Sequence, residues 1–375
     1  QKIVEYWPMC KTGNLMRLKG LDSRDFGNLL DQSQKTLTGV IRESVGPEKA
    51  MYMRMSLHLT NIRAEYLQCK TDGKLRQAPI VVCIIGDSSV GKSTISNLMT
   101  VTMLKAMGRP CSPDRIRTYN PTDKYDSWAD GLTEALICDD LGALKPEYSD
   151  VNPVDFLIRI KNNAPMTATK ADVEEKGKIP IDVSLVVVTM NTMASLTEGA
   201  ACPTAVLRRF DFCVRPIVKP EFRVNEAVNQ LSSAKVIDHY GTMAGVPNVW
   251  DFQIITPVII QNGNPTNKLR NHSDVLQSFC QRDMQGTSTS MEWKHECTLD
   301  TPAMLKYAIE KARSHKLTQT YIVDTNSTLA DTISICESCG NVNDYCTCDV
   351  KPEFGFSLQW TKMAVAYQSG LFGML

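Results

Sequence analysis

The chain has 375 residues, of which 43% are hydrophobic, and this size predicts roughly two or three domains with sizeable cores. Lys and Arg together number 41, as do Asp and Glu, so the formal net charge is zero. This balance excludes a protein that binds nucleic acid through an overall basic field, and any such contact must come from a local groove or pore.

The sequence shows no run of about eighteen apolar residues and no signal peptide, so we expect neither a membrane-spanning helix nor a secretory leader. The thirteen cysteines are scattered along the chain, which is typical of reduced thiols in a cytosolic protein. The first residue is Gln1 rather than Met. We therefore expect a fragment, or a product cut from a longer precursor.

Residues 1–75 have a mostly helical pattern and hold 12 basic against 8 acidic residues. Apolar segments with interspersed cations, such as 14–21 and 50–57, are compatible with a helix that binds a membrane surface or mediates oligomerisation. They are equally compatible with helices packed on the next domain. The turn-forming residues 71–73, shortly before Pro79, predict the entry into that domain.

Residues 76–225 read as strands alternating with helices, which predicts an α/β fold with a parallel sheet. The first strand is expected over the apolar, mostly β-branched residues 80–85. The pattern G-x-x-x-x-G-K-[ST] follows at residues 86–93, and a helix is expected from Thr94 to Met107. The strand before and the helix after the pattern argue against a chance match, so this segment predicts a phosphate-binding loop.

The chemistry of phosphate binding explains the residue types in this loop. Glycine at positions 86 and 91 lets the backbone curl so that successive N–H groups point at a phosphate, and the helix N-terminus adds partial positive charge. Lys92 is expected to reach the β- and γ-phosphates, and the Ser93 hydroxyl to bind Mg²⁺. The predicted nucleotide-binding residues are Gly86, Asp87, Ser88, Ser89, Val90, Gly91, Lys92, Ser93 and Thr94.

A polar loop is expected over residues 115–130, followed by an apolar strand that begins at Ala135 and ends in two acids. Beside a phosphate loop, Asp139 at the carboxyl end of a parallel strand can hold Mg²⁺. Asp140 can then orient or deprotonate a water molecule. The alternative is a strand that ends in a solvated turn, and the preceding phosphate loop favours the metal site.

A helix over 154–161 leads to a charged run at 170–178. The charges alone favour a solvated hairpin. The alternative is a loop that points into a central pore and contacts the nucleic-acid backbone through Lys170, Lys176 and Lys178.

The next apolar strand, residues 185–190, ends in Asn191, which can contact the γ-phosphate and the attacking water or merely cap the strand. Two adjacent cations follow, Arg208 and Arg209. A guanidinium can complete the nucleotide site of a neighbouring subunit by stabilising charge on the transferring phosphoryl group. The alternative is a pair of surface cations.

The order of these motifs resembles the superfamily 3 helicases of positive-strand RNA viruses, specifically the 2C-type NTPase of picornavirus-like viruses. The resemblance covers residues 76–215. It implies an AAA+ module that assembles into hexameric rings with ATP sites between subunits. It assigns Lys92 and Ser93 to the Walker A motif, Asp139 and Asp140 to Walker B, Asn191 to motif C, and Arg208 and Arg209 to the arginine-finger positions. The Lys176-Gly177 run lies where the family places its pore-facing segment.

Two features depart from many relatives. Residues 189–191 read Thr-Met-Asn where many have Thr-Thr-Asn, and a long spacer separates the arginine pair from the next cysteine cluster. The spacer suggests a dicistrovirus-like relative from an arthropod or marine host.

Residues 226–335 carry no chemistry that the sequence reveals, although one or two strands are expected over 249–260 and a helix over 301–315. Four cysteines then predict a tetrahedral Zn²⁺ site: Cys336, Cys339, Cys346 and Cys348. Residues 331–350 contain no Lys or Arg, which argues against a nucleic-acid-binding knuckle. The apolar tail, residues 349–375, predicts an amphipathic helix, which by the resemblance inserts into a pocket on the adjacent subunit. The alternatives are contact with a membrane surface and packing on its own domain.

Together these observations predict an N-terminal helical region (1–75), an AAA+ ATPase domain (76–225), an extension (226–335), a zinc segment (336–348) and a terminal helix (349–375). The predicted function is an ATP-dependent viral RNA helicase that uses ATP, Mg²⁺ and Zn²⁺. Its predicted partners are RNA, further copies of the chain in a hexameric ring, and other viral replication proteins, at the cytoplasmic face of host membranes. The alternative is a scaffold that binds membrane and RNA and whose oligomerisation is controlled by nucleotide.

Overall fold

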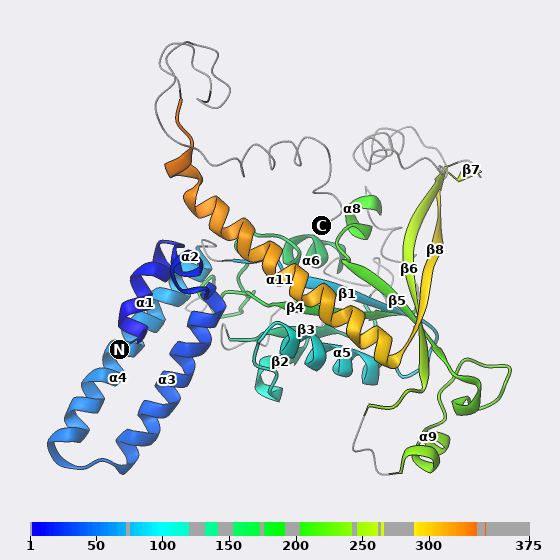
Figure 1. The fold of residues 1–375 in the computed structure, drawn as a ribbon, viewed down its shortest axis with the longest axis horizontal. Coiled ribbons are helices and arrows are strands. Elements are labelled where there is room, and N and C mark those ends of the chain that lie inside the picture. Colours follow the sequence, from blue (N-terminus) through cyan, green and yellow to red (C-terminus); the bar gives the residue numbers. More distant parts are fainter. Residues whose placement is uncertain are drawn as a thin grey trace.

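The computed structural model describes residues 2–72, 76–119, 132–141, 153–172, 176–191, 203–241, 246–261, 264–265, 289–335 and 342. Its centre is a sheet of eight strands in this part of the chain, and four helices precede the sheet (Figure 1). No helix among the described residues is long and apolar enough to cross a membrane.

Five parallel strands form the main part of the sheet, in the order β2-β3-β4-β1-β5. Strand β6 pairs antiparallel with β5, and both β7 and β8 pair with β6. The strands are β1 (Ile80–Ile85), β2 (Ile116–Thr118), β3 (Ala135–Cys138), β4 (Leu185–Met190), β5 (Phe212–Val218), β6 (Trp250–Gln261), β7 (Asn264–Pro265) and β8 (Thr289–Asp300). The predicted α/β fold with a parallel sheet is confirmed.

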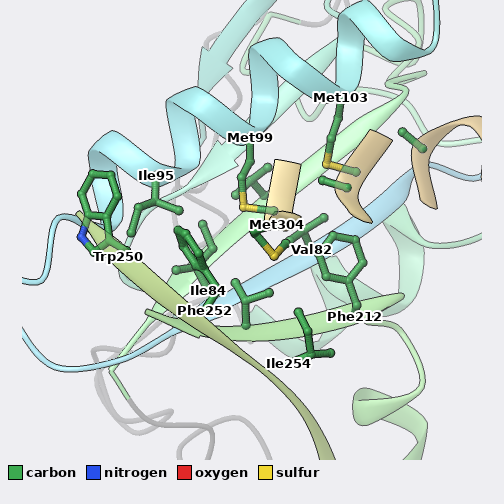
Figure 2. Close-up of a cluster of buried hydrophobic side chains, with 14 of the residues drawn as sticks. Val82, Ile84, Ile95, Met99, Met103, Phe212, Trp250, Phe252, Ile254 and Met304 are labelled. Carbon is green, nitrogen blue, oxygen red and sulfur yellow. The ribbon is translucent and has the colours of Figure 1, made fainter. Parts of the chain in front are cut away.

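The central strands are almost entirely apolar because helices cover both faces of the sheet. Every residue of β1, β3 and β4 is buried. On one face, α5 (Lys92–Ala106) and α11 (Thr301–Thr332) pack together, and Figure 2 shows Met99 and Met103 of α5 beside Met304 of α11. On the other face, the side chains of α6 (Pro153–Ile160) and α8 (Pro203–Leu207) join a second cluster.

Two local expectations differ from the structure. The segment from 115 to 130 was expected to be a loop, but residues 116–118 form the edge strand β2, after a short 3₁₀ helix η1 (Pro113–Arg115). A strand of three residues with little burial carries too weak an alternating pattern to be recognised. The helix expected over 301–315 continues to Thr332. Its second half was not predicted because the sequence after residue 315 is polar and lacks a helical pattern of apolar residues.

The residues after 225 continue the same sheet and core. Strand β6 extends the sheet beyond β5, and α11 runs diagonally across one face (Figure 1). A small element lies between β5 and β6, made of η3 (Pro220–Phe222) and α9 (Ser233–Tyr240). The strand expected over 249–260 is β6, and its long partner β8 was not foreseen.

The N-terminal helices are α1 (Lys2–Lys11), α2 (Leu15–Lys19), α3 (Ser23–Glu43) and α4 (Gly46–Thr71). They have a core of their own around Trp7, Phe26 and Tyr66, whose rings pack at centroid distances of 5.6–6.4 Å. Asp22 and Asp25 form a capping box at the start of α3, which satisfies the free N–H groups there.

Buried ion pairs attach these helices to the domain that contains the sheet. Asp182, just before β4, pairs with Arg24 of α3 and with Lys70 of α4, whose Nζ lies 2.9 Å from the Asp182 carboxylate. Arg109 after α5 binds both Asp22 and Asp25, and Arg115 binds Asp31. These contacts show that the N-terminal helices pack on the sheet domain, which is one of the two interpretations of residues 1–75.

The charge state of Asp182 follows from its two partners. Burial alone raises the pKa of this carboxyl group, but the charges of Arg24 and Lys70 outweigh burial and hold the pKa below its ordinary value of 3.8. A lowered pKa in the folded state means that the ionised carboxylate stabilises the fold above about pH 4, and that this contribution is lost as the pH falls below that value.

Replacing Asp182 by Asn should therefore lower the free energy of unfolding by about 3–5 kcal/mol at neutral pH, because Lys70 and Arg24 remain buried without a counter-charge. Denaturant unfolding measures the change, and its size should shrink below pH 4. The matched control, Asp238→Asn on exposed α9, should stay within about 0.5 kcal/mol of the wild type. Equal stability of the two variants would show that the pairs do not hold the N-terminal helices.

Candidate nucleotide-binding site

The predicted phosphate loop lies between β1 and α5. Strand β1 ends at Ile85, and α5 begins at Lys92. Two residues of the loop have left-handed backbones, Ser89 with φ 64° and Gly91 with φ 92°. Glycine adopts such angles readily, which explains position 91, directly before the helix. The strand–loop–helix order inferred from the sequence is confirmed.

The Lys92 ammonium lies at the centre of this loop. Its Nζ donates hydrogen bonds to the carbonyl oxygens of Gly86 and Asp87, at 2.9 and 3.0 Å. It also donates to Oδ1 of Asn191, at 2.6 Å. Lys92 and Asn191 are 99 positions apart in sequence, so the sheet brings together two residues that the sequence analysis assigned to one site.

The parallel register explains this meeting. Ile85 at the end of β1 is the partner of Met190 at the end of β4, and the Gly86 N–H donates to the Met190 carbonyl at 3.1 Å. The residues that follow the two strands therefore leave the sheet side by side. Since the carboxyl ends of parallel strands face the same edge, the phosphate loop and Asn191 share that edge.

The two predicted acids lie at the same edge, after β3. Strand β4 separates β3 from β1, so Asn191 stands between the phosphate loop and the acids. Asp139 and Asp140 are both exposed. Asp140 has φ 47°, a left-handed backbone that aspartate tolerates better than most residues.

Thr189 connects the acids to β4, a role that the sequence analysis missed. Its buried hydroxyl donates to Oδ1 of Asp139 at 2.5 Å and accepts the Asp140 N–H at 2.9 Å. The Leu141 N–H donates to the Thr189 carbonyl at 2.9 Å. One threonine thus fixes the turn that carries both carboxylates. The available signal was a hydroxyl residue near the end of an otherwise apolar strand.

These residues fit a nucleoside triphosphate with Mg²⁺. The loop surrounds an ammonium, and the exposed Ser93 lies in the first turn of α5, where helix N–H groups are unpaired. The Asp139 carboxylate, held by Thr189 but open to solvent, is the hard oxygen ligand that Mg²⁺ prefers. Binding, charge neutralisation and water orientation can therefore all occur at one edge of the sheet.

The two predicted arginine fingers have different surroundings. Arg209 donates from Nη1 to the Lys161 carbonyl oxygen at 3.0 Å, and partial burial, with the charge of Arg208, lowers its pKa. Arg208 is exposed. Of the two, Arg208 is the one whose side chain is open to solvent.

The predicted RNA-contact lysines lie near the amino ends of the strands, opposite the end that carries the phosphate loop. Thr167 and Pro180 form an antiparallel bridge at the base of a hairpin, whose chain then enters β4 at its amino end. Lys176 and Lys178 are exposed and Lys170 is half-buried. The Lys178 carbonyl oxygen accepts a 3.5 Å hydrogen bond from the Thr71 hydroxyl at the end of α4.

The comparison with known protein families matches residues 82–192 to the family described as RNA helicase. This matched segment contains the phosphate loop, both acids and Asn191. The segment is an RNA helicase domain of the superfamily 3, 2C-like type. The resemblance to the helicases of positive-strand RNA viruses is thereby confirmed.

Relatives of this helicase domain occur in viral polyproteins. The chain is 31% identical over 160 residues to the genome polyprotein of Rice tungro spherical virus (strain A), and 29% over 176 residues to the RNA1 polyprotein of Tomato torrado virus. It is 26% identical over 156 residues to the replicase polyprotein of Acute bee paralysis virus, in line with the expected arthropod-virus relative. The alignments cover 40%, 46% and 40% of the chain, but 4%, 8% and 8% of the polyproteins.

The predicted zinc ligands Cys336, Cys339, Cys346 and Cys348 lie outside the described residues, as does the predicted terminal helix. Within the part of the chain that the structure describes, no group of three or more His, Cys, Asp or Glu side chains is arranged to hold a metal ion. The zinc site stays a prediction from the sequence.

Replacing Thr189 by Val, which has nearly the same shape, should raise the Mg²⁺ concentration needed for half-maximal nucleotide binding by about tenfold. The hydroxyl that positions Asp139 is lost while the strand packing is kept. A magnesium titration at fixed nucleotide concentration measures the shift. Thr189→Ser retains the hydroxyl and should behave as the wild type, and an identical shift in both variants would contradict the assigned role.

Proposed function

We propose that this chain is a ring-forming ATPase that uses ATP hydrolysis to move or remodel single-stranded RNA in the replication complex of a positive-strand RNA virus. The observation that carries the proposal is the meeting of Lys92, Asp139 and Asn191 at the carboxyl ends of β1, β3 and β4. The helicase family match and the viral relatives support it.

The residues divide the work of phosphoryl transfer. Lys92 binds the β- and γ-phosphates, which replace at least one of its present carbonyl and amide partners. Ser93 and Asp139 hold Mg²⁺, which when bound neutralises negative charge on the phosphates. Asp140 accepts the proton of the attacking water. Asn191, whose oxygen now contacts Lys92, orients that water and senses the γ-phosphate.

The hydrogen bond between Lys92 and Asn191 couples nucleotide binding at the loop to the position of the residue that follows β4. An ammonium has three donors, and the three acceptors around Lys92 occupy them. A γ-phosphate that attracts Lys92 must therefore release at least one acceptor. We infer that Asn191 is the one released, since a side-chain amide can rotate more easily than a loop carbonyl.

The partner of this site is a second copy of the chain. Arg208 is exposed and its neighbour Arg209 is fixed to the Lys161 carbonyl, so Arg208 can reach across an interface while Arg209 holds the segment in place. A guanidinium supplied in this way stabilises charge that develops on the transferring phosphoryl group. The proposed assembly is a hexameric ring with peripheral attachment to host membranes and contacts to other replication proteins.

The proposed RNA contact lies at the amino ends of the strands, away from the nucleotide site. Lys176 and Lys178 are exposed on a hairpin that leads directly into β4, the strand that ends at Asn191. A change at the γ-phosphate can therefore reach the lysines through one buried strand. Lysines at this position would contact phosphates of the RNA backbone without reading bases.

In the alternative function, the chain is a scaffold that binds membrane and RNA, and nucleotide binding only controls its assembly. Measuring ATP hydrolysis with and without single-stranded RNA, over a range of protein concentrations, separates the two functions. The motor requires turnover that RNA stimulates and that rises steeply with assembly. Negligible turnover together with ATP-dependent assembly would favour the scaffold.

Lys92→Ala should reduce ATP turnover by at least about a hundredfold, because the phosphates lose their only ammonium partner from the loop. The measurement is phosphate release at saturating ATP. Lys105→Ala removes an exposed lysine from the last turn of the same helix and should leave turnover unchanged. Persistent turnover in Lys92→Ala would refute the site.

Mixing inactive Lys92→Ala subunits with inactive Arg208→Ala subunits should restore part of the activity. Some interfaces in the mixed ring then pair an intact loop with an intact Arg208. The mixture is compared with each variant alone at the same total concentration. Arg209→Ala should instead lower the thermal unfolding midpoint, because Arg209 is bound within its own subunit. Absence of any recovery in the mixture would argue against action between subunits.

A further inference from the structure

Two residues distant in sequence donate hydrogen bonds to the backbone carbonyls of the second half of the phosphate loop. The indole Nε1 of Trp250, at the start of β6, donates a buried 2.7 Å hydrogen bond to the Val90 carbonyl oxygen. The Leu231 N–H, from the element between β5 and β6, donates to the Ser89 carbonyl oxygen at 2.9 Å. Both donors lie outside the segment that matches the helicase family, which ends at residue 192.

These two hydrogen bonds set the direction of the loop amides. The described peptide bonds are all trans, and in a trans peptide the carbonyl and the following N–H point in opposite directions. A Ser89 carbonyl directed at Leu231 turns the Val90 N–H away from it. A Val90 carbonyl directed at Trp250 does the same for the Gly91 N–H. The two amides are thereby directed to the side of the loop away from these donors.

Packing reinforces the hydrogen bonds. A Cβ atom built on Gly91 would lie 3.0 Å from Cζ2 of Trp250 and 3.3 Å from Cδ2 of Leu231, so the backbone rests directly on these two side chains. Gly91 is therefore required twice, for its φ of 92° and for this close approach. Any larger residue there would push the loop off its support.

Trp250 is itself held rigidly. It is 1% exposed and pairs with Val218 of β5, while its carbonyl oxygen accepts a 3.4 Å hydrogen bond from the Thr301 hydroxyl at the start of α11. Figure 2 shows its ring beside Ile95 of α5. Strand β5 and helix α11 thus fix the backbone of Trp250, and its buried ring packs beside α5 with its only polar atom directed at the phosphate loop.

We propose that Trp250 and Leu231 are positioning residues for triphosphate binding, forming a fixed support that orients the Val90 and Gly91 amides toward the phosphates. They do not touch the nucleotide themselves. The inference rests on the proposed function, because it assigns these residues to the ATP site. It gives the chain after residue 225 a part in the chemistry, which the sequence did not reveal.

Trp250→Phe tests the proposal, because it removes the indole N–H and keeps an aromatic ring. The dissociation constant of a fluorescent methylanthraniloyl-ATP with Mg²⁺, followed by anisotropy on the full chain, should rise about fivefold to tenfold, as expected for one lost hydrogen bond. The matched control is Trp7→Phe, which removes the indole donor to Glu65 in the N-terminal core and should leave affinity unchanged.

A purely structural role for Trp250 gives a different result, in which the thermal unfolding midpoint falls while the affinity of the folded protein stays at the wild-type value. That outcome would overturn the proposal. If Trp250→Phe does not fold, Leu231→Ala replaces it. This variant keeps the backbone N–H that donates to Ser89 and removes the half-buried side chain that packs against Gly91, so it should spare the fold and weaken binding about threefold. Unchanged affinity in Leu231→Ala would then overturn the proposal.

Failure of the proposed function looks different from failure of this inference. If the wild type and Trp7→Phe do not bind the nucleotide analogue at all, the ATP site itself is refuted. If both bind and the folded Trp250→Phe binds equally well, the site stands and its support is refuted.

Discussion

The side-by-side register of β1 and β4 is the constraint on which the nucleotide site depends. Ile85 and Met190 end their strands as partners, so Gly86 and Asn191 begin the next segments at the same height. The hydrogen bond between Lys92 and Asn191 is possible only in this register. Moving β4 by one residue would turn Thr189 to the opposite face of the sheet and release the turn that carries Asp139.

The site is built from three layers of increasing distance from the phosphates. Lys92, Asp139 and Asn191 face the place where a triphosphate would bind. Thr189 fixes the acidic turn from inside β4, and Trp250 supports the loop from β6. Each outer group makes its contact through a directional hydrogen bond, which is buried at Trp250 and partly buried at Thr189. A rigid apolar core thus carries a small number of oriented polar groups at its edge.

At the amino ends of the strands, charged side chains join the N-terminal helices to the sheet. There Asp182, Arg109 and Arg115 bind the N-terminal helices through buried ion pairs. Such pairs add little net stability over an apolar contact, but each one penalises any arrangement that separates its members. They therefore specify how α3 and α4 sit on the sheet. The hairpin that carries Lys176 and Lys178 contacts the end of α4 at the same ends of the strands.

The sequence by itself determined the local parts of this protein. The phosphate loop, the strands before Asp139 and Asn191, and the class of fold could be predicted because each depends on neighbouring residues: an apolar run, a glycine pair, a polar group at a strand end. The family resemblance supplied the common purpose of these motifs, and the helicase match to residues 82–192 agrees with it.

Only the tertiary structure decided the order of the strands, the bridge made by Thr189, the different surroundings of Arg208 and Arg209, and the support that Trp250 gives the loop. The physical reason is that these features depend on contacts between residues far apart in sequence, such as those 48, 50 and 160 positions apart. A buried tryptophan or threonine has the same local pattern whether or not its polar atom finds a distant partner. That partner is chosen when the chain packs, because a buried donor must be satisfied by whichever acceptor the fold places beside it.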